Sequence, residues 1–175
     1  MLKYLVIGLC LLGSCQVAAK ETEHRELGAH EHGHGKANIA IEGDNLLIEI
    51  EVPGDDIVGF EHVAKSAADK AKAQTAKAKL ADSLNVVTLA AGAGCQQVSA
   101  ETKLHGGGTE GGHSEFHISY AFMCTRIAGL KSIAFAYFKT FSNAKELAVA
   151  VVAPKGQKNF EVDPTENRIN ISGLI

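Results

Sequence analysis

Apolar side chains alternate with polar ones over two neighbouring runs, and this alternation is the feature that most restricts the fold. One face collects the apolar members of both runs, which are Ala37, Ile39 and Ile41, then Leu46, Ile48, Ile50 and Val52. A period of two is typical of a β-strand with one buried face, and Gly-Asp-Asn at 43–45 is typical of a turn. The sequence therefore predicts a β-hairpin with one face in the core and the other in water.

Further strand patterns dominate the rest of the chain. They lie at 95–104, 114–124, 131–138, 147–152, 159–162 and 168–171. The clearest helix spans 66–81, where Ser66 and Asp69 resemble a capping box. Its apolar stripe is mostly alanine, so we expect the helix to lie close against the sheet while burying little area. Together these patterns predict an α+β fold, with a largely antiparallel β-sheet or sandwich and one main helix packed on it.

Residues 1–19 have the pattern of an export signal. Lys3 precedes an apolar run that is too short to span a bilayer stably. Val-Ala-Ala at 17–19 suits ordinary cleavage before Lys20, whereas Leu-Gly-Ser-Cys at 12–15 resembles a bacterial lipobox that would lipidate Cys15. We therefore divide the chain into a signal peptide at 1–19, a flexible histidine-rich leader at 20–35 and a single domain at 36–175.

Charge argues against nucleic acid as a partner, and hydropathy argues against a membrane-spanning segment beyond the signal region. The formal charge is -3 at pH 7 and the chain has no basic cluster, so nucleic acid is a poor candidate, because phosphate binding needs clustered lysine and arginine. Beyond the signal region, no apolar run is long enough to cross a membrane.

Two cysteines, Cys95 and Cys124, remain beyond the leader. In an oxidising compartment such a pair favours a disulfide, with free thiols or zinc thiolates as alternatives. Val98, Ala100 and Leu104 have the inward phase of their strand, and Cys95 is out of step with them. A bond to Cys124 therefore requires a bulge, or that Cys95 precede the regular strand.

Histidine is concentrated in three patches. The candidate metal ligands are His30, His32 and His34 in the leader, His62 in the connection after the hairpin, and His113, Glu115 and His117 at spacing i, i+2, i+4 along one predicted strand. Neutral imidazole binds divalent transition metals near pH 7, and a carboxylate adds an oxygen ligand. Alternatively, His62 beside Phe60 is a satisfied, half-buried group, and the strand residues form an ordinary hydrophilic face.

The leader also matches the metalloprotease string H-E-x-x-H, from His30 to His34. That reading requires a stable helix, and each of the three glycines at 28, 33 and 35 costs a helix interior roughly 1 kcal/mol relative to alanine. No separate general base or substrate pocket can be read from the sequence. We therefore expect no enzymatic activity.

Several of these segments together resemble the ZrgA-like zinc-uptake proteins of Gram-negative envelopes. The resemblance covers about residues 28–162 and includes Gly-Ala-His-Glu-His-Gly-His-Gly at 28–35, Ile-Val-Gly-Phe-Glu-His at 57–62, Gly-Cys at 94–95, and Ser-Glu-Phe-His-Ile-Ser-Tyr at 114–120 with Cys124. It implies a periplasmic zinc-binding protein that captures or buffers Zn²⁺ and assists its uptake, alongside a zinc ABC importer or TonB/ExbB/ExbD-type components.

One departure from the family pattern concerns the loop at 105–113. In the family this loop is usually a long run of histidines and acids, and here it is mostly glycine.

The alternative function is an envelope adaptor or sensor module of a transport system, without a stoichiometric metal site. The residues themselves do not distinguish zinc from nickel or copper, because imidazole suits all three.

Overall fold

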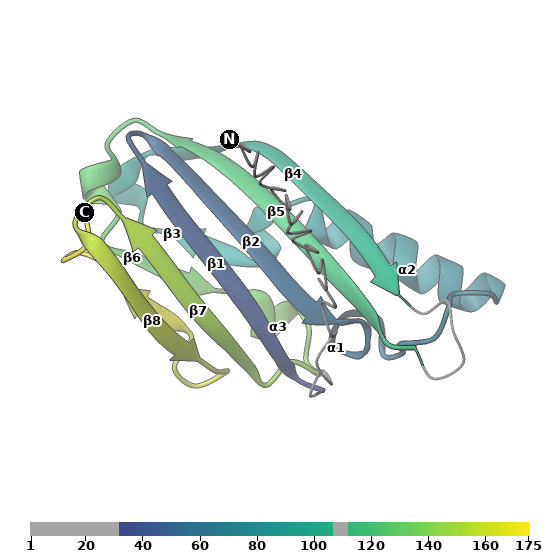
Figure 1. Ribbon diagram of the computed structural model, residues 1–175. Coiled ribbons are helices and arrows are strands. Elements are labelled where there is room, and N and C mark those ends of the chain that lie inside the picture. The colour runs from purple at the N-terminus through teal and green to yellow at the C-terminus, as the bar shows by residue number, and fades with distance from the viewer. Residues whose placement is uncertain (1–31, 107–111) are drawn as a thin grey trace, which may run out of the picture.

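The computed structural model describes residues 32–106 and 112–175, and a six-stranded sheet is its largest element (Figure 1). The strand order is β4-β5-β2-β1-β7-β8. The bounds are β1 His34–Glu42, β2 Asn45–Pro53, β4 Cys95–Gly106, β5 Ser114–Cys124, β7 Glu146–Ala153 and β8 Gly156–Val162. Neighbouring strands are antiparallel, except that β1 and β7 are parallel.

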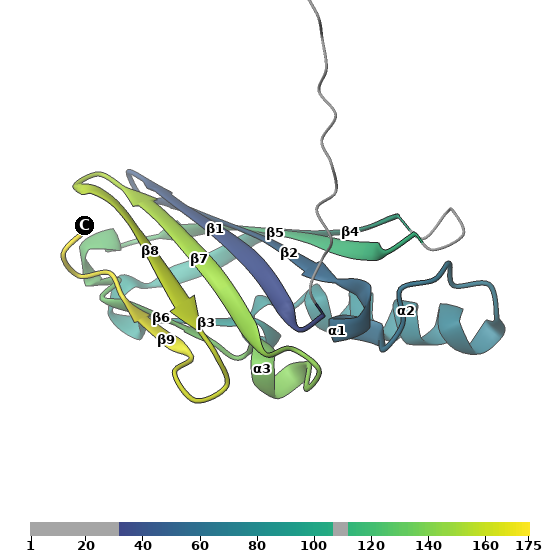
Figure 2. The same cartoon turned by 60° about the horizontal axis from the view of Figure 1, so that its bottom comes forward.

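A second layer covers one face of this sheet (Figure 2). It contains a three-stranded sheet of order β3-β6-β9, formed by β3 Val87–Leu89, β6 Ser132–Phe135 and β9 Arg168–Asn170. It also contains the helices α1 Gly54–Val58, α2 Ala67–Leu80 and α3 Tyr137–Thr140, and the 3-10 turns η1 Ser83–Asn85, η2 Ala91–Ala93 and η3 Ile127–Gly129. The opposite face of the large sheet, called the outer face below, is turned toward the viewer in Figure 1.

The core lies between the two layers, and the predicted hairpin supplies much of it. Along β1 and β2 buried and exposed residues alternate, so that Ile39, Ile48 and Ile50 are almost fully buried. The inward side chains of β5, from Phe116 to Cys124, continue the same layer. Burying each large apolar side chain contributes about 1.5–3 kcal/mol. The hairpin and the phase of the strand at 114–124 are therefore confirmed.

The main helix is confirmed and buries little area, as expected, but it lies against the sheet only near its C-terminal end. Ser66 caps α2 by accepting a hydrogen bond from the Asp69 N–H at 3.0 Å. Only Ala76 and Leu80 are buried, and the Tyr120 hydroxyl donates to the Leu80 carbonyl at 2.7 Å. Thus α2 is held to the sheet at its C-terminal end and extends past β4 (Figure 2). An alanine stripe buries too little area to hold the whole helix against the sheet. Overall the fold is mostly β with few helices.

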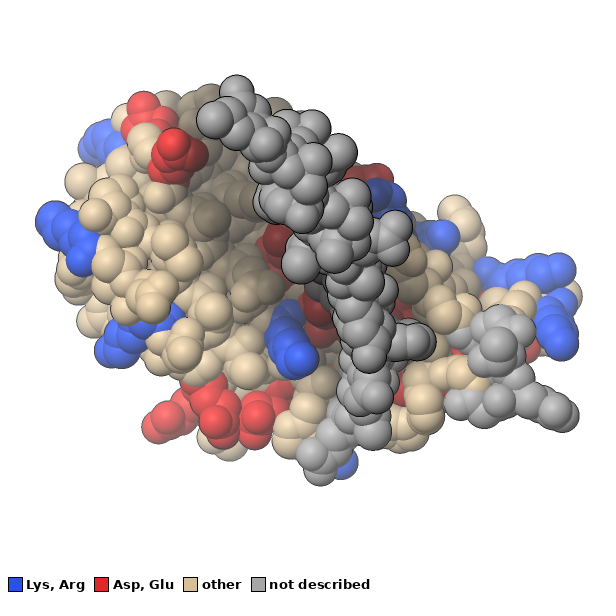
Figure 3. All heavy atoms as spheres, in the orientation of Figure 1, with Lys and Arg blue, Asp and Glu red and all other residues tan. Residues whose placement is uncertain are grey.

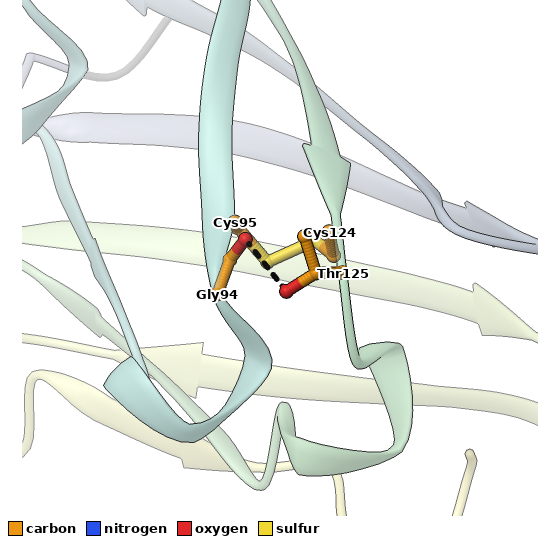
Figure 4. Close-up of a disulfide and its surroundings, with 4 residues drawn as sticks. All are labelled: Gly94, Cys95, Cys124 and Thr125. Atoms are coloured by element: carbon orange, nitrogen blue, oxygen red, sulfur yellow. Dashed lines mark hydrogen bonds between the residues drawn. A yellow bond between two sulfur atoms is a disulfide. The ribbon is translucent and has the colours of Figure 1, made fainter.

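A disulfide joins Cys95 at the start of β4 to Cys124 at the end of β5, as the sequence favoured (Figure 4). These two residues are Cα partners, and the register shifts between Gln97 and Ser99. The required bulge is therefore present. The expected inward phase of Val98 was wrong, because the bulge turns this side chain outward and leaves it 68% exposed.

The predicted strand at 131–138 is shorter in the structure. β6 ends at Phe135, and Tyr137 begins α3. Tyr137 is buried like Ile133 and Phe135, so the alternation of burial continues although the backbone has turned. The Tyr137 N–H donates to the carbonyl of Val86, which lies just before β3, and β6 is not continued. None of the described helices is long and apolar enough to cross a membrane.

Candidate metal site

Side chains from three distant segments meet beside the start of β5. His32 precedes β1, Glu61 follows α1, and His113 precedes β5. One potential ligand atom of each lies within 4.8 Å of the others. His32 Nε2 lies 3.2 Å from Glu61 Oε2, and His113 Nδ1 contacts the same oxygen. We call these three residues the leader site.

The backbone of Gly33 fixes His32 in place. The Gly33 N–H donates to Asp56 Oδ1 at 2.8 Å, and its carbonyl accepts the N–H groups of Lys145 at 2.8 Å and Glu146 at 2.9 Å. Glycine is required here, because φ is +89° and an added Cβ would press on the Lys145 side chain. The segment just before β1 is thus anchored to both α1 and β7.

Asp56 is the buried partner in that anchor. It is 3% exposed, and burial raises its pKa from the ordinary 3.8 to about 6. The Gly33 N–H and the Tyr137 hydroxyl, which lies 3.4 Å from Oδ2, act in the opposite direction. At neutral pH the carboxylate is therefore mainly ionised and accepts the Gly33 N–H.

Glu61 is the most buried member of the leader site. Gly59 ends α1 with φ of +76° and leads the chain into this residue. The Glu61 side chain is only 11% exposed, and its Oε1 is buried without a hydrogen-bond partner among the described residues. An unsatisfied buried oxygen costs about 1–3 kcal/mol, a cost that a bound cation would offset.

Close backbone approach brings His113 to Glu61. A Cβ added at Gly54 would overlap Ser114 Oγ, and one added at Gly106 would overlap the His113 carbonyl. The two glycines therefore let α1 and the end of β4 lie against the start of β5. His113 and His32 remain 52% and 56% exposed, so both rings are accessible from solvent.

A second group of polar side chains lies on the outer face of the sheet. His117 Nε2 is 2.8 Å from Glu115 Oε2, and His117 Nδ1 is 3.8 Å from Glu51 Oε1. The His105 ring lies 4.5 Å from the His117 ring, measured between centroids. Glu115 and His117 thus share a face as their spacing predicted, while His113 lies with Glu61 and His32.

The other predicted ligands lie apart from both groups. The exposed His62 ring stacks on Phe60 at 4.6 Å between centroids, and its Nδ1 lies 3.0 Å from the Val63 carbonyl. His34 Nδ1 is 3.4 Å from Glu146 Oε1. His30 lies outside the described residues. Metal binding by these three histidines stays a prediction.

Sequence reasoning missed Glu61 as a candidate ligand. It directly precedes His62, the predicted ligand, in the Val-Gly-Phe-Glu-His segment. The signal was the acidic residue next to the histidine. Which of two adjacent side chains points to His113 depends on the turn after Gly59, and the sequence spacing does not specify it.

The leader site offers two imidazole nitrogens and one carboxylate oxygen. Zn²⁺ takes such ligands in tetrahedral geometry, and three protein ligands leave a fourth position for water or another donor. A family model described as "ZrgA family zinc uptake protein" matches residues 29–171, a range that contains all three leader-site residues. No curated protein sequence gives a significant match.

Proposed function

Because the chain belongs to the ZrgA family of zinc uptake proteins, we propose that it binds Zn²⁺ in the periplasm, captures or buffers the ion and assists its uptake. The observation that carries this proposal is the convergence of His32, Glu61 and His113 from three segments far apart in the sequence. The donor set is one that zinc accepts, and the buried Glu61 oxygen without a partner is suited to a cation.

The geometry favours reversible binding over catalysis. Glu61 is nearly buried, whereas both imidazoles are half exposed, so an ion held there is reachable by an incoming ligand. An accessible ion suits exchange with a partner, and the partners we propose are a zinc ABC importer or TonB/ExbB/ExbD-type components. We propose no enzymatic step.

Zinc binding by this site depends on pH, because an imidazole must be unprotonated to coordinate the ion. Acidification of the buffer therefore releases zinc from the leader site. The release does not require unfolding of the sheet, whose core is apolar.

The test is a competition titration of the exported full chain with zinc and a chromophoric chelator. We expect His113→Ala and Glu61→Gln each to weaken zinc binding at least about tenfold, since even partners that merely orient metal ligands are worth 10–100-fold. His62→Ala is the matched control, because its ring stacks on Phe60 outside the leader site. Unchanged zinc affinity in both ligand variants would refute the proposed site, and a wild-type chain without zinc affinity would favour the adaptor function.

A further inference from the structure

The outer face of the sheet presents a second set of potential metal ligands, none of which belongs to the leader site. His105 comes from β4, Glu115 and His117 come from β5, and Glu51 comes from β2. These strands are neighbours in the order β4-β5-β2. Four nitrogen or oxygen donors thus come from three adjacent strands.

The strand register places these side chains together. His105 is the Cα partner of Glu115, and Glu51 is the Cα partner of His117. Directly paired side chains on one face have Cβ atoms about 4.5–5.5 Å apart, and residues i and i+2 share a face. The contacts agree, since His117 lies beside Glu115, Glu51 and the His105 ring.

A cavity of about 330 Å³ opens beside these rings. It is lined by His105, His117, Lys103 and the carboxylates of Glu49, Glu51 and Glu101, among others. Two lysines lie nearby. The Lys103 ammonium is paired with Glu101 at 3.0 Å, and Lys36 on β1 is the Cα partner of Glu51 on β2. The three lining carboxylates outnumber the one lining lysine, so the cavity favours a cation. Acidic side chains are visible on this face near the middle of the view (Figure 3).

We propose that His105, Glu115 and His117 form a second divalent-metal site, and that this site binds Zn²⁺. Glu51, which lies beside the other ring nitrogen of His117, adds negative charge next to the site. The inference rests on the proposed function only for the identity of the ion. It extends that function, because His113 of the leader site and Glu115 are two residues apart, a spacing of about 7 Å along a strand. Two neighbouring positions would let one chain hold two ions and exchange them along the start of β5.

The test measures zinc stoichiometry of the exported full chain by native mass spectrometry. The variants are His105→Ala/His117→Ala for the second site and His32→Ala/His113→Ala for the leader site. Lys103→Ala, on the same face, is the matched control. Because the replaced histidines of the second site are exposed or half exposed, we expect that variant to fold, and circular dichroism checks this. We expect each double variant to lose one zinc ion relative to wild type, while the control loses none.

The outcomes separate this inference from the proposed function. An unchanged zinc count and affinity in His105→Ala/His117→Ala would overturn the second site, and the leader site would stand if His32→Ala/His113→Ala still lost one ion. Conversely, loss of an ion only in the outer-face variant would support the second site and remove the leader site. Glu115→Gln provides a milder test, and we expect it to weaken binding of one ion without changing the fold.

Discussion

The Asp56 carboxylate should influence zinc affinity without contacting the ion, because it holds the backbone next to His32. Asp56→Ala removes the acceptor of the Gly33 N–H, a bond of 2.8 Å. The Gly33 carbonyl stays bonded to the N–H groups of Lys145 and Glu146. We therefore expect the variant to lose the conformational order of about one backbone residue next to His32. That order is worth about 1–2 kcal/mol, which predicts zinc binding about 5- to 30-fold weaker.

The assay is a zinc competition titration at pH 7.5 on wild type and three variants. Asp56→Asn keeps an oxygen acceptor for the Gly33 N–H while removing the charge, so we expect an affinity within about threefold of wild type, since only one hydrogen bond changes in kind. Asp55→Ala removes the neighbouring carboxylate and is expected to have no effect. Wild-type zinc affinity in a folded Asp56→Ala variant would refute the claim that the Asp56–Gly33 hydrogen bond positions His32. Equal losses in the Asn and Ala variants would show that charge, rather than the hydrogen bond, is responsible.

Three further predictions concern stability. Reducing the Cys95–Cys124 disulfide, which closes a loop with a sequence separation of 29, should lower the free energy of unfolding by about 3–4 kcal/mol in urea titrations, and no loss would contradict this. Gly54→Ala should lower the free energy of unfolding by about 1–3 kcal/mol and weaken zinc binding, because the new Cβ would overlap Ser114 Oγ. An unchanged thermal unfolding temperature would argue against that contact. For Asp56 the raised pKa of about 6, against 3.8, means that its stabilising contribution is complete below pH 3.8 and is lost as pH rises through 6. Wild type should therefore lose up to about 3 kcal/mol relative to Asp56→Asn between pH 4 and 7, and a pH-independent difference would contradict the burial argument.

The strands could be predicted because their side-chain period is local. Ile39, Ile48 and Phe116 face the core as the alternation required, and Ser66 caps the main helix. The parallel pairing of β1 with β7 joins segments more than a hundred residues apart, and no short pattern encodes such a pairing. The turn at Tyr137 was missed because its side chain stays buried in phase with the preceding strand.

The candidate site could be predicted by residue type but not by grouping. The sequence indicated that His32 and His113 are candidate ligands, but it did not indicate that Glu61 lies between them. That arrangement depends on Gly59, which ends α1, and on Gly54, which lets α1 approach β5. Both are tertiary effects of backbone shape, so spacing along the chain could not reveal them.

Anomalous diffraction at the zinc edge, from crystals of the protein grown with Zn²⁺, tests the central claim most directly. The account predicts an anomalous peak within about 2.0–2.2 Å of His32 Nε2, a Glu61 carboxylate oxygen and a His113 ring nitrogen. A fully occupied zinc ion held elsewhere, with these three side chains uncoordinated, would contradict it.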